Sequence, residues 1–169
     1  MTLAALLLPE FDHEMASTRR LLERVPDGKS DWQPHTRSMR LGRLATHVAE
    51  TPAWATNALL KDEHDIAPPG APSPHSRILP TKAEILALFD GNAAEARTAL
   101  ADALDEEFEK PWTFKVTGKT YWTKPKYEVY RIFSLNHMIH HRAQLGHYLR
   151  LLHIPIPGMY GPSADEPVD

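Results

Sequence analysis

Apolar side chains recur every three or four residues in four long stretches of the chain, which is the period of one helix face. The pattern begins at once, over residues 3–25. Its repeating positions are Leu7, Phe11, Met15, Thr18, Leu22 and Val25. Pro26, Asp27 and Gly28 come next and predict the end of this first helix.

Two further helices have recognisable starting residues. The second is predicted over residues 38–60, with Ser38 as its N-cap and a kink at Pro52, whose ring nitrogen cannot donate to the carbonyl four residues back. The third is predicted from Thr81 to about residue 107, because Thr81 and Glu84 match the capping-box pattern.

The fourth helix is predicted over residues 125–152, with Pro125 in its first turn and Pro155 and Pro157 beyond its end. Residues 65–80 contain five prolines and no apolar period, which indicates a long crossover loop. Residues 112–122 have an extended pattern around Gly118 that fits a small hairpin. We therefore expect an all-α fold, an antiparallel four-helix bundle with one long crossover and minimal strand content, formed by a single domain over residues 1–169.

Composition narrows the classes of function. The chain has 42% hydrophobic and 24% charged residues and a net charge of -3, with no concentration of Lys and Arg that would bind nucleic acid. The apolar N-terminal run is cut by Pro9 and Glu10 before it could span a membrane. There is no cysteine, so a metal would need nitrogen and oxygen ligands. We expect a cytoplasmic protein that binds neither nucleic acid nor membrane.

The segment NHMIHHRAQL places His137 and His141 one helical turn apart, on the core-facing stripe of the fourth helix. His47 lies on the core-facing stripe of the second helix. A buried histidine is often satisfied by a backbone carbonyl or a hydroxyl, and that would explain His47 taken alone. Three histidines on two core faces instead predict a shared divalent metal ion.

Several catalytic motifs can be set aside. A helical zinc protease needs a glutamate directly after the first histidine, where this chain has Met138. No nucleophile elbow, phosphate-binding glycine loop or EF-hand is present. For a general base, Glu14 and Tyr148 are candidates, although the ordinary roles of such residues are a boundary charge and a core aromatic ring. The catalytic residues thus stay unknown.

Three segments resemble the DinB-like (DinB/YfiT) metalloenzymes: WQPHTRSMRLGRLATHVAE, NHMIHHRAQLGHYLRLL and IPGMYGPSADE. The resemblance implies that His47, His137 and His141 are the three metal ligands, and Gln144 matches the glutamine that follows them in the family. Ala143 stands where the family usually has glycine.

The resemblance also implies a four-helix bundle, commonly a homodimer, that holds nickel or zinc, with iron or manganese as alternatives. Some relatives are transferases or isomerases that use low-molecular-weight thiols such as bacillithiol or mycothiol. Because this chain has no cysteine, such a thiol would be a cosubstrate, beside a small-molecule substrate. An apolar stripe on the back of the fourth helix also favours a homodimer: Ile132, Leu135, Ile139 and Gly146. The alternative is that the first and third helices bury both sides of the fourth within the monomer.

Three functions therefore stay open. The chain is a metal-dependent transferase or hydrolase, a non-catalytic metal-binding or ligand-sensing bundle, or a structural bundle in which the histidines cluster by chance. A water ligand facing a pocket would favour the enzyme over a closed structural site.

Overall fold

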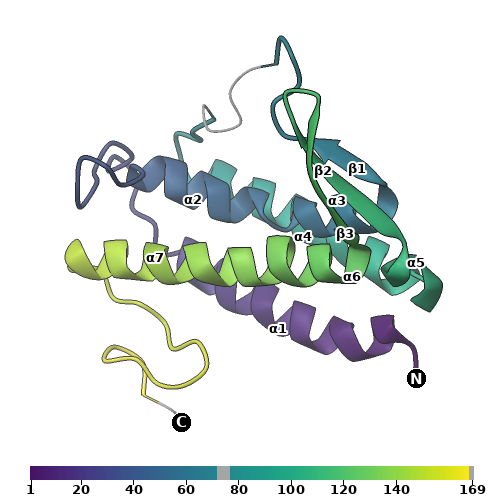
Figure 1. The fold of residues 1–169 in the computed structure, drawn as a ribbon. Coiled ribbons are helices and arrows are strands. Elements are labelled where there is room, and N and C mark those ends of the chain that lie inside the picture. Colours follow the sequence, from purple (N-terminus) through teal and green to yellow (C-terminus); the bar gives the residue numbers. More distant parts are fainter. Residues whose placement is uncertain (72–76, 168–169) are drawn as a thin grey trace.

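The computed structural model describes residues 1–71 and 77–167. Four long helical segments lie side by side, and a small sheet stands at one end of them (Figure 1). The helices are α1 (Leu3–Leu22), α2 (Leu41–Glu50), α3 (Ala53–Leu60), α4 (Lys82–Asp102), α5 (Asp105–Glu109), α6 (Lys126–Val129) and α7 (His137–Leu151), with a π-helix, η1 (Tyr130–Asn136), between the last two. The helical periods of the sequence are thus confirmed in all four stretches.

Helix α1 lies between α4 and α7 and runs antiparallel to α4. The start of α1 meets the end of the α4 region, where the amide of Leu3 donates to Asp105, and the amide of Lys82 at the start of α4 donates to Asp27 after α1. Helix α2 packs against α4 and α7. Because α2 and α4 run in the same direction (Figure 1), the connection from α3 to α4 has to cross the length of the bundle. Residues 72–76 of the predicted crossover loop lie outside the described residues.

At Pro52, where the sequence predicts a kink, the helix is interrupted: α2 ends at Glu50 and α3 begins at Ala53. The predicted start at Ser38 is wrong. The amide of Ser38 closes a turn onto the carbonyl of His35, and the helix begins at Leu41, whose amide donates to the carbonyl of Trp32. That backbone bond replaces a side-chain cap.

The third predicted helix begins as expected and ends early. Thr81 and Glu84 form the predicted capping box, with the Thr81 hydroxyl accepting from the Glu84 amide. Helix α4 ends at Asp102, and the extended residues Ala103 and Leu104 separate it from the short α5.

The fourth predicted helix contains a wider turn that the sequence did not indicate. Residues 130–136 form the π-helix η1, and the amide of His137 donates to the carbonyl of Ile132, five residues back. A turn of this kind is uncommon in helices and frequent at functional sites. Phe133 from η1 and His137 from α7 both line the pocket described below.

The expectation of an all-α fold is wrong, because the bundle has a three-stranded sheet in the order β1-β2-β3. The predicted hairpin is confirmed: β2 (Pro111–Val116) pairs antiparallel with β3 (Lys119–Pro125). The missed strand is β1 (Glu63–Asp65), which pairs parallel with β2 although about fifty residues separate them. The Asp65 carboxylate accepts the amides of Thr117 and Gly118, which fixes the hairpin turn against β1.

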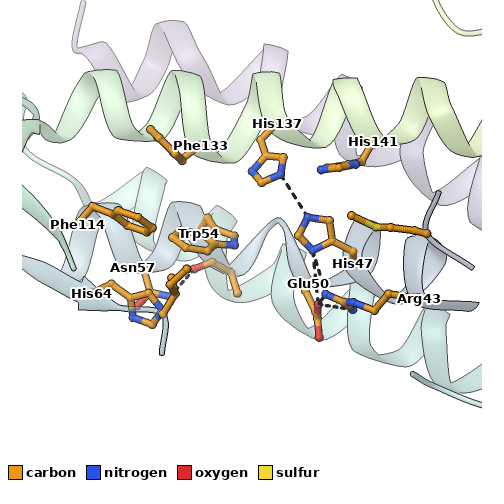
Figure 2. A pocket seen from close by; sticks show the side chains of 13 residues that line it. Arg43, His47, Glu50, Trp54, Asn57, His64, Phe114, Phe133, His137 and His141 are labelled. Carbon is orange, nitrogen blue, oxygen red and sulfur yellow. Dashed lines mark hydrogen bonds and ion pairs between the residues drawn. The ribbon is translucent and has the colours of Figure 1, made fainter. Parts of the chain in front are cut away.

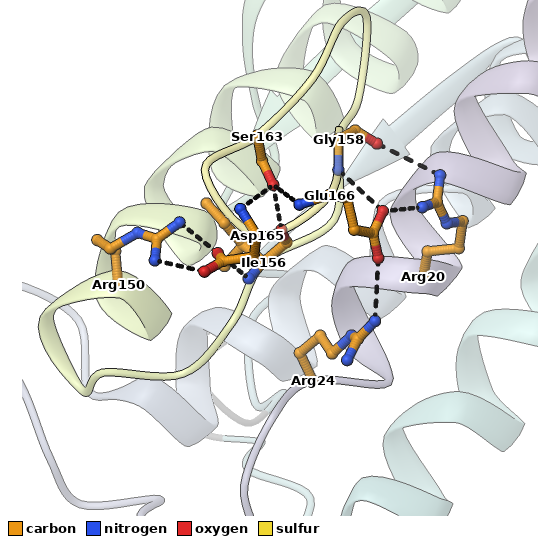
Figure 3. A network of polar contacts seen from close by, with 8 residues as sticks. All are labelled: Arg20, Arg24, Arg150, Ile156, Gly158, Ser163, Asp165 and Glu166. Atoms are coloured by element: carbon orange, nitrogen blue, oxygen red, sulfur yellow. Dashed lines mark hydrogen bonds and ion pairs between the residues drawn. The ribbon is translucent and has the colours of Figure 1, made fainter. Parts of the chain in front are cut away.

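The segment after α7 returns across the surface and is fastened by charged side chains (Figure 3). Glu166 pairs with Arg20 of α1 and with Arg24 just after that helix, and Asp165 pairs with Arg150 of α7. Within the part of the chain that the structure describes, no helix has the length and apolar character needed to cross a membrane.

Candidate metal centre

The three predicted ligands lie together between α2 and α7 (Figure 2). The Nε2 atoms of His47 and His137 are 3.2 Å apart, and one ligand atom from each of His47, His137 and His141 falls within 4.8 Å of the others. The sequence placed these residues on core-facing stripes, and the packing of α2 against α7 brings the two stripes into contact.

Hydrogen bonding fixes which nitrogen of His141 faces its neighbours. Its Nδ1–H donates to Oε1 of Gln144, one turn further along α7, at 2.8 Å. Nε2 therefore carries the free lone pair. A hydrogen bond from the second ring nitrogen is typical of metal-binding histidines, because it sets both the tautomer and the ring orientation.

His47 has a charged partner behind it. Its Nδ1 lies 3.7 Å from the carboxylate of Glu50, which Arg43 holds with hydrogen bonds of 2.9 Å from both Nη1 and Nη2. Nη2 of Arg43 is also 3.3 Å from Nδ1 of His47. If Nε2 is to bind a metal, Nδ1 carries the proton, and Glu50 is then the group that accepts it.

Burial sets the charge of the cluster. It lowers the pKa of His137 to about 4, with smaller contributions from His47 and His140. Burial likewise lowers the pKa of His141 to about 4. Burial also acts to raise the pKa of Glu50, but hydrogen bonds from His47 and Arg43 outweigh it and hold that pKa below its ordinary value. At neutral pH the two α7 histidines are uncharged and Glu50 is a carboxylate.

The histidines form part of the wall of an open pocket of about 370 Å³. A volume of this order suits a small molecule. Most of the surface is apolar, and the lining residues are Met39, Arg43, His47, Glu50, Ala53, Trp54, Asn57, His64, Ile66, Phe114, Phe133, His137 and His141.

The chain is similar to known proteins in sequence and in fold. The family model of the DinB superfamily matches residues 10–145. The chain belongs to the DinB superfamily. Among solved structures, a DinB-like protein from Bacillus cereus ATCC 10987 has a TM-score of 0.70 at 19% identity, covering 91% of this chain and 95% of its own. A DinB-like protein from Bacillus subtilis has a TM-score of 0.65 at 15% identity, covering 89% and 96%. No curated protein matches the chain.

In this DinB superfamily protein the two candidate general bases lie outside the pocket lining. Glu14 is buried between α1 and α7, where its carboxylate pairs with Arg142 at 2.6 Å and accepts from the hydroxyl of Tyr160. Tyr148 donates to the carbonyl of Met39 and packs edge-on against Trp32. Both side chains have structural partners, as their ordinary roles would suggest.

Arg43 and Glu50, the charged pair behind His47, were not predicted from the sequence. The signal was present, because Glu50 follows His47 by three residues and Arg43 precedes it by four, and helix neighbours at these spacings face one another. The walls contributed by β1 and β2 were also missed, because they depend on the sheet.

The donor set of this DinB superfamily site suits a divalent transition metal. Imidazole nitrogens are the donors that zinc, nickel and iron accept, whereas magnesium and calcium prefer oxygen. The second nitrogen of each ring has a polar group beside it: Gln144 for His141, Glu50 for His47 and the backbone of Phe133 for His137. The three-histidine cluster therefore fits a metal ion.

Proposed function

We propose that this protein is a metal-dependent enzyme acting on a small molecule, either a transferase that uses a low-molecular-weight thiol or a hydrolase. One observation carries the proposal: the three histidines line an open pocket rather than a closed core. Metal sites that serve only structure use four protein ligands, whereas catalytic sites use three and leave a position open. We propose nickel or zinc as the ion.

A divalent ion held by His47, His137 and His141 would supply Lewis-acid chemistry, lowering the pKa of a water or thiol that it binds. The chain's own groups have supporting roles. Glu50 and Gln144 fix the orientation of His47 and His141. The apolar side chains around the pocket limit the water that surrounds a bound substrate, which strengthens electrostatic interactions there.

The thiol-transferase form of the proposal follows from composition and family. The chain has no cysteine, so a thiol nucleophile has to arrive as a cosubstrate. In such a reaction the sulfur forms a bond to an electrophilic carbon, the leaving group departs from that carbon, and the thiol proton passes to solvent or base. In the hydrolase form, water takes the place of the thiol.

A second candidate is a non-catalytic metal-binding or ligand-sensing protein. The Arg43–Glu50 pair favours this candidate. Among the described lining residues Glu50 is the one carboxylate, and it is already paired with Arg43, so the pocket offers no unpaired carboxylate as a general base. A sensor needs only binding, without a general base.

The test begins with protein purified without a nickel column, in which metal is measured by elemental analysis before and after dialysis with zinc or nickel. We expect about one ion per chain after loading. The loaded protein is then mixed with a low-molecular-weight thiol and a panel of alkyl halides and epoxides, and loss of free thiol is followed. Hydrolysis of a panel of esters is measured separately. Metal binding without turnover of thiol or of ester substrates would favour the sensor. An absence of metal binding would leave a structural bundle.

We also propose a homodimer through the long helix that ends in α7. Leu135 and Gly146, two positions of the predicted stripe, are buried within the chain itself, and Gly146 faces Leu21. Ile132 stays 42% exposed and Ile139 half-buried, so these two support the proposal.

A further inference from the structure

The pocket has two ends of different character. Figure 2 shows His47 and His141 at one end and Phe114 and Phe133 at the other, with Trp54 between them. The aromatic end is built from three separate parts of the chain: Trp54 from α3, Phe114 from β2 and Phe133 from η1. The sheet therefore forms part of the pocket, since without β2 the aromatic end would lack the wall that Phe114 provides.

The aromatic rings at this end are held in place by other rings. Phe114 stacks on Trp122 with centroids 5.1 Å apart and planes 13° apart, and on Phe133 at 6.1 Å and 24°. The indole of Trp54 meets the His64 ring edge-on at 5.3 Å. Rings fixed in this way lose little freedom when a further ring packs against them.

Core packing does not by itself explain these residues. Trp112 of the same strand as Phe114 is completely buried and fills the core. Trp54, Phe114 and Phe133 are only partly buried, and all three line the pocket. A partly exposed aromatic surface inside a pocket is suited to a flat apolar group of a ligand.

The charges at the other end indicate what that ligand carries. A metal ion on three imidazoles keeps its two positive charges, because the ligands are neutral. Arg43 and Glu50 pair with one another and add no net charge. Among the described lining residues the other titratable group is His64, whose pKa burial lowers, so it is neutral at neutral pH. The loaded pocket thus has an uncompensated positive end.

Building on the proposed function, we propose that the substrate is an aromatic anion whose ring packs against Trp54, Phe114 and Phe133 and whose negative group lies at the three histidines. Neither feature alone defines this class. The apolar wall would also accept an aliphatic chain, and the ion would also accept a small inorganic anion.

Three probes of matched size separate the two features: 3-phenylpropionate, 3-cyclohexylpropionate and 3-phenylpropionamide. Binding is measured by calorimetry on the zinc-loaded and the metal-free protein. We expect 3-phenylpropionate to bind the loaded protein about three- to tenfold more tightly than the cyclohexyl compound, although the saturated ring is more hydrophobic. The amide should bind more weakly than the acid in the loaded protein, and this difference should shrink without zinc.

Two variants locate the ring. Phe114→Leu and Trp54→Leu should each remove most of the preference for the aromatic probe while leaving zinc stoichiometry unchanged. Tyr127→Leu is the matched control, because Tyr127 is an exposed aromatic residue outside the pocket. Thermal unfolding of each variant establishes that it is folded. Because Phe114 and Trp54 lie on different elements, one variant still tests the proposal if the other fails to fold.

The outcomes distinguish this inference from the proposed function. Zinc binding with equal affinity for the phenyl and cyclohexyl probes overturns the inference and leaves a metal enzyme for another substrate class. Equal binding of acid and amide to the loaded protein also overturns it. If zinc does not bind, the proposed function fails, and the anion part of the inference fails with it.

Discussion

The Nε2 atoms of His47 and His137 face one another at 3.2 Å across the contact between α2 and α7, although the residues are 90 positions apart in the chain. Two imidazole nitrogens at that separation are within hydrogen-bonding distance, and His141, whose Nδ1 donates to Gln144, brings a ligand nitrogen to the same space. A shared metal ion is the simplest partner for all three, because imidazole lone pairs without a partner are costly away from water.

Removing one ligand should therefore abolish tight metal binding. The substitutions His47→Ala, His137→Ala and His141→Ala should each weaken metal affinity by more than about 100-fold. Loss of a residue that only hydrogen-bonds to a ligand already costs up to about that much, and these variants lose the ligand itself. His147→Ala is the control, since His147 is exposed on the same helix. His140, also exposed, should tolerate alanine far better than its neighbour His141. Metal titration followed by calorimetry measures these affinities, and an unchanged value for any one of the three would remove that histidine from the site.

Glu50 should act on the metal through His47. Glu50→Gln keeps the shape but removes the negative charge, and we expect metal affinity to fall about 10- to 100-fold, as for other outer partners of metal-binding histidines. Glu50→Asp should restore part of the affinity if the carboxylate reaches Nδ1. The control is Glu23→Gln, which alters an exposed ion pair with Arg19. Equal affinities for Glu50→Gln and the unmodified protein would show that this carboxylate serves only its pairing with Arg43.

The metal-free protein should lose stability as the pH falls. Burial lowers the pKa of His137 and of His141 from 6.5 to about 4, so between these values the unfolded chain binds more protons than the folded one. Stability therefore decreases as pH is lowered through this window and stops responding to these two groups below it. Urea unfolding in the presence of a chelator should show a lower midpoint at about pH 5 than at about pH 7. Replacing both residues by asparagine should reduce the difference, and an identical slope in that variant would contradict the assignment.

Glu14 should matter for folding and not for the metal. Its carboxylate and the Arg142 guanidinium are both buried, with side-chain exposures of 5% and 3%. Glu14→Ala would leave the arginine charge buried without its carboxylate, which costs about 3–5 kcal/mol of stability. Asp12→Ala removes the partner of Arg97 from an exposed pair and should cost far less stability, because water screens this pair. Metal affinity should be the same in both variants. A large loss of affinity in folded Glu14→Ala would revive its candidacy as a residue of the site.

The dimer proposal depends on Ile132 and Ile139. Light scattering should give the unmodified protein a mass near twice 19.1 kDa, and Ile132→Glu and Ile139→Glu should shift it toward the monomer. Leu151→Glu, which changes an exposed leucine of the same helix outside the stripe, should leave the mass unchanged. A monomeric mass for the unmodified protein at micromolar concentration would sink the proposal.

Local pattern was sufficient for part of this molecule. The four helical stretches, the break at Pro52, the capping box of Thr81 and Glu84, and the hairpin around Gly118 each depend on residues close together in the sequence. The same patterns placed His47, His137 and His141 on faces that the bundle brings together.

Other features depend on distant residues or on small energetic differences. Strand β1 has only three residues, and its pairing with β2 depends on residues about fifty positions away, so no alternation reveals it. Residues 130–136 contain no proline or glycine that would mark the π-helix in the sequence. The role of Glu14 as half of a buried ion pair depends on Arg142, which lies 128 residues further along the chain.

The π-helix has a consequence for comparing this chain with its relatives. A five-residue hydrogen-bonded step contains one residue more than the α-helical step, so η1 is equivalent to a single-residue insertion into a continuous helix. A relative without the insertion would keep the turns of α7 in phase but rotate everything before η1 by about 100° relative to it. An alignment with such a relative should therefore place a one-residue gap within residues 130–136. With this gap, the histidines of α7 after η1 and the residues of α6 before it are both matched with their equivalents.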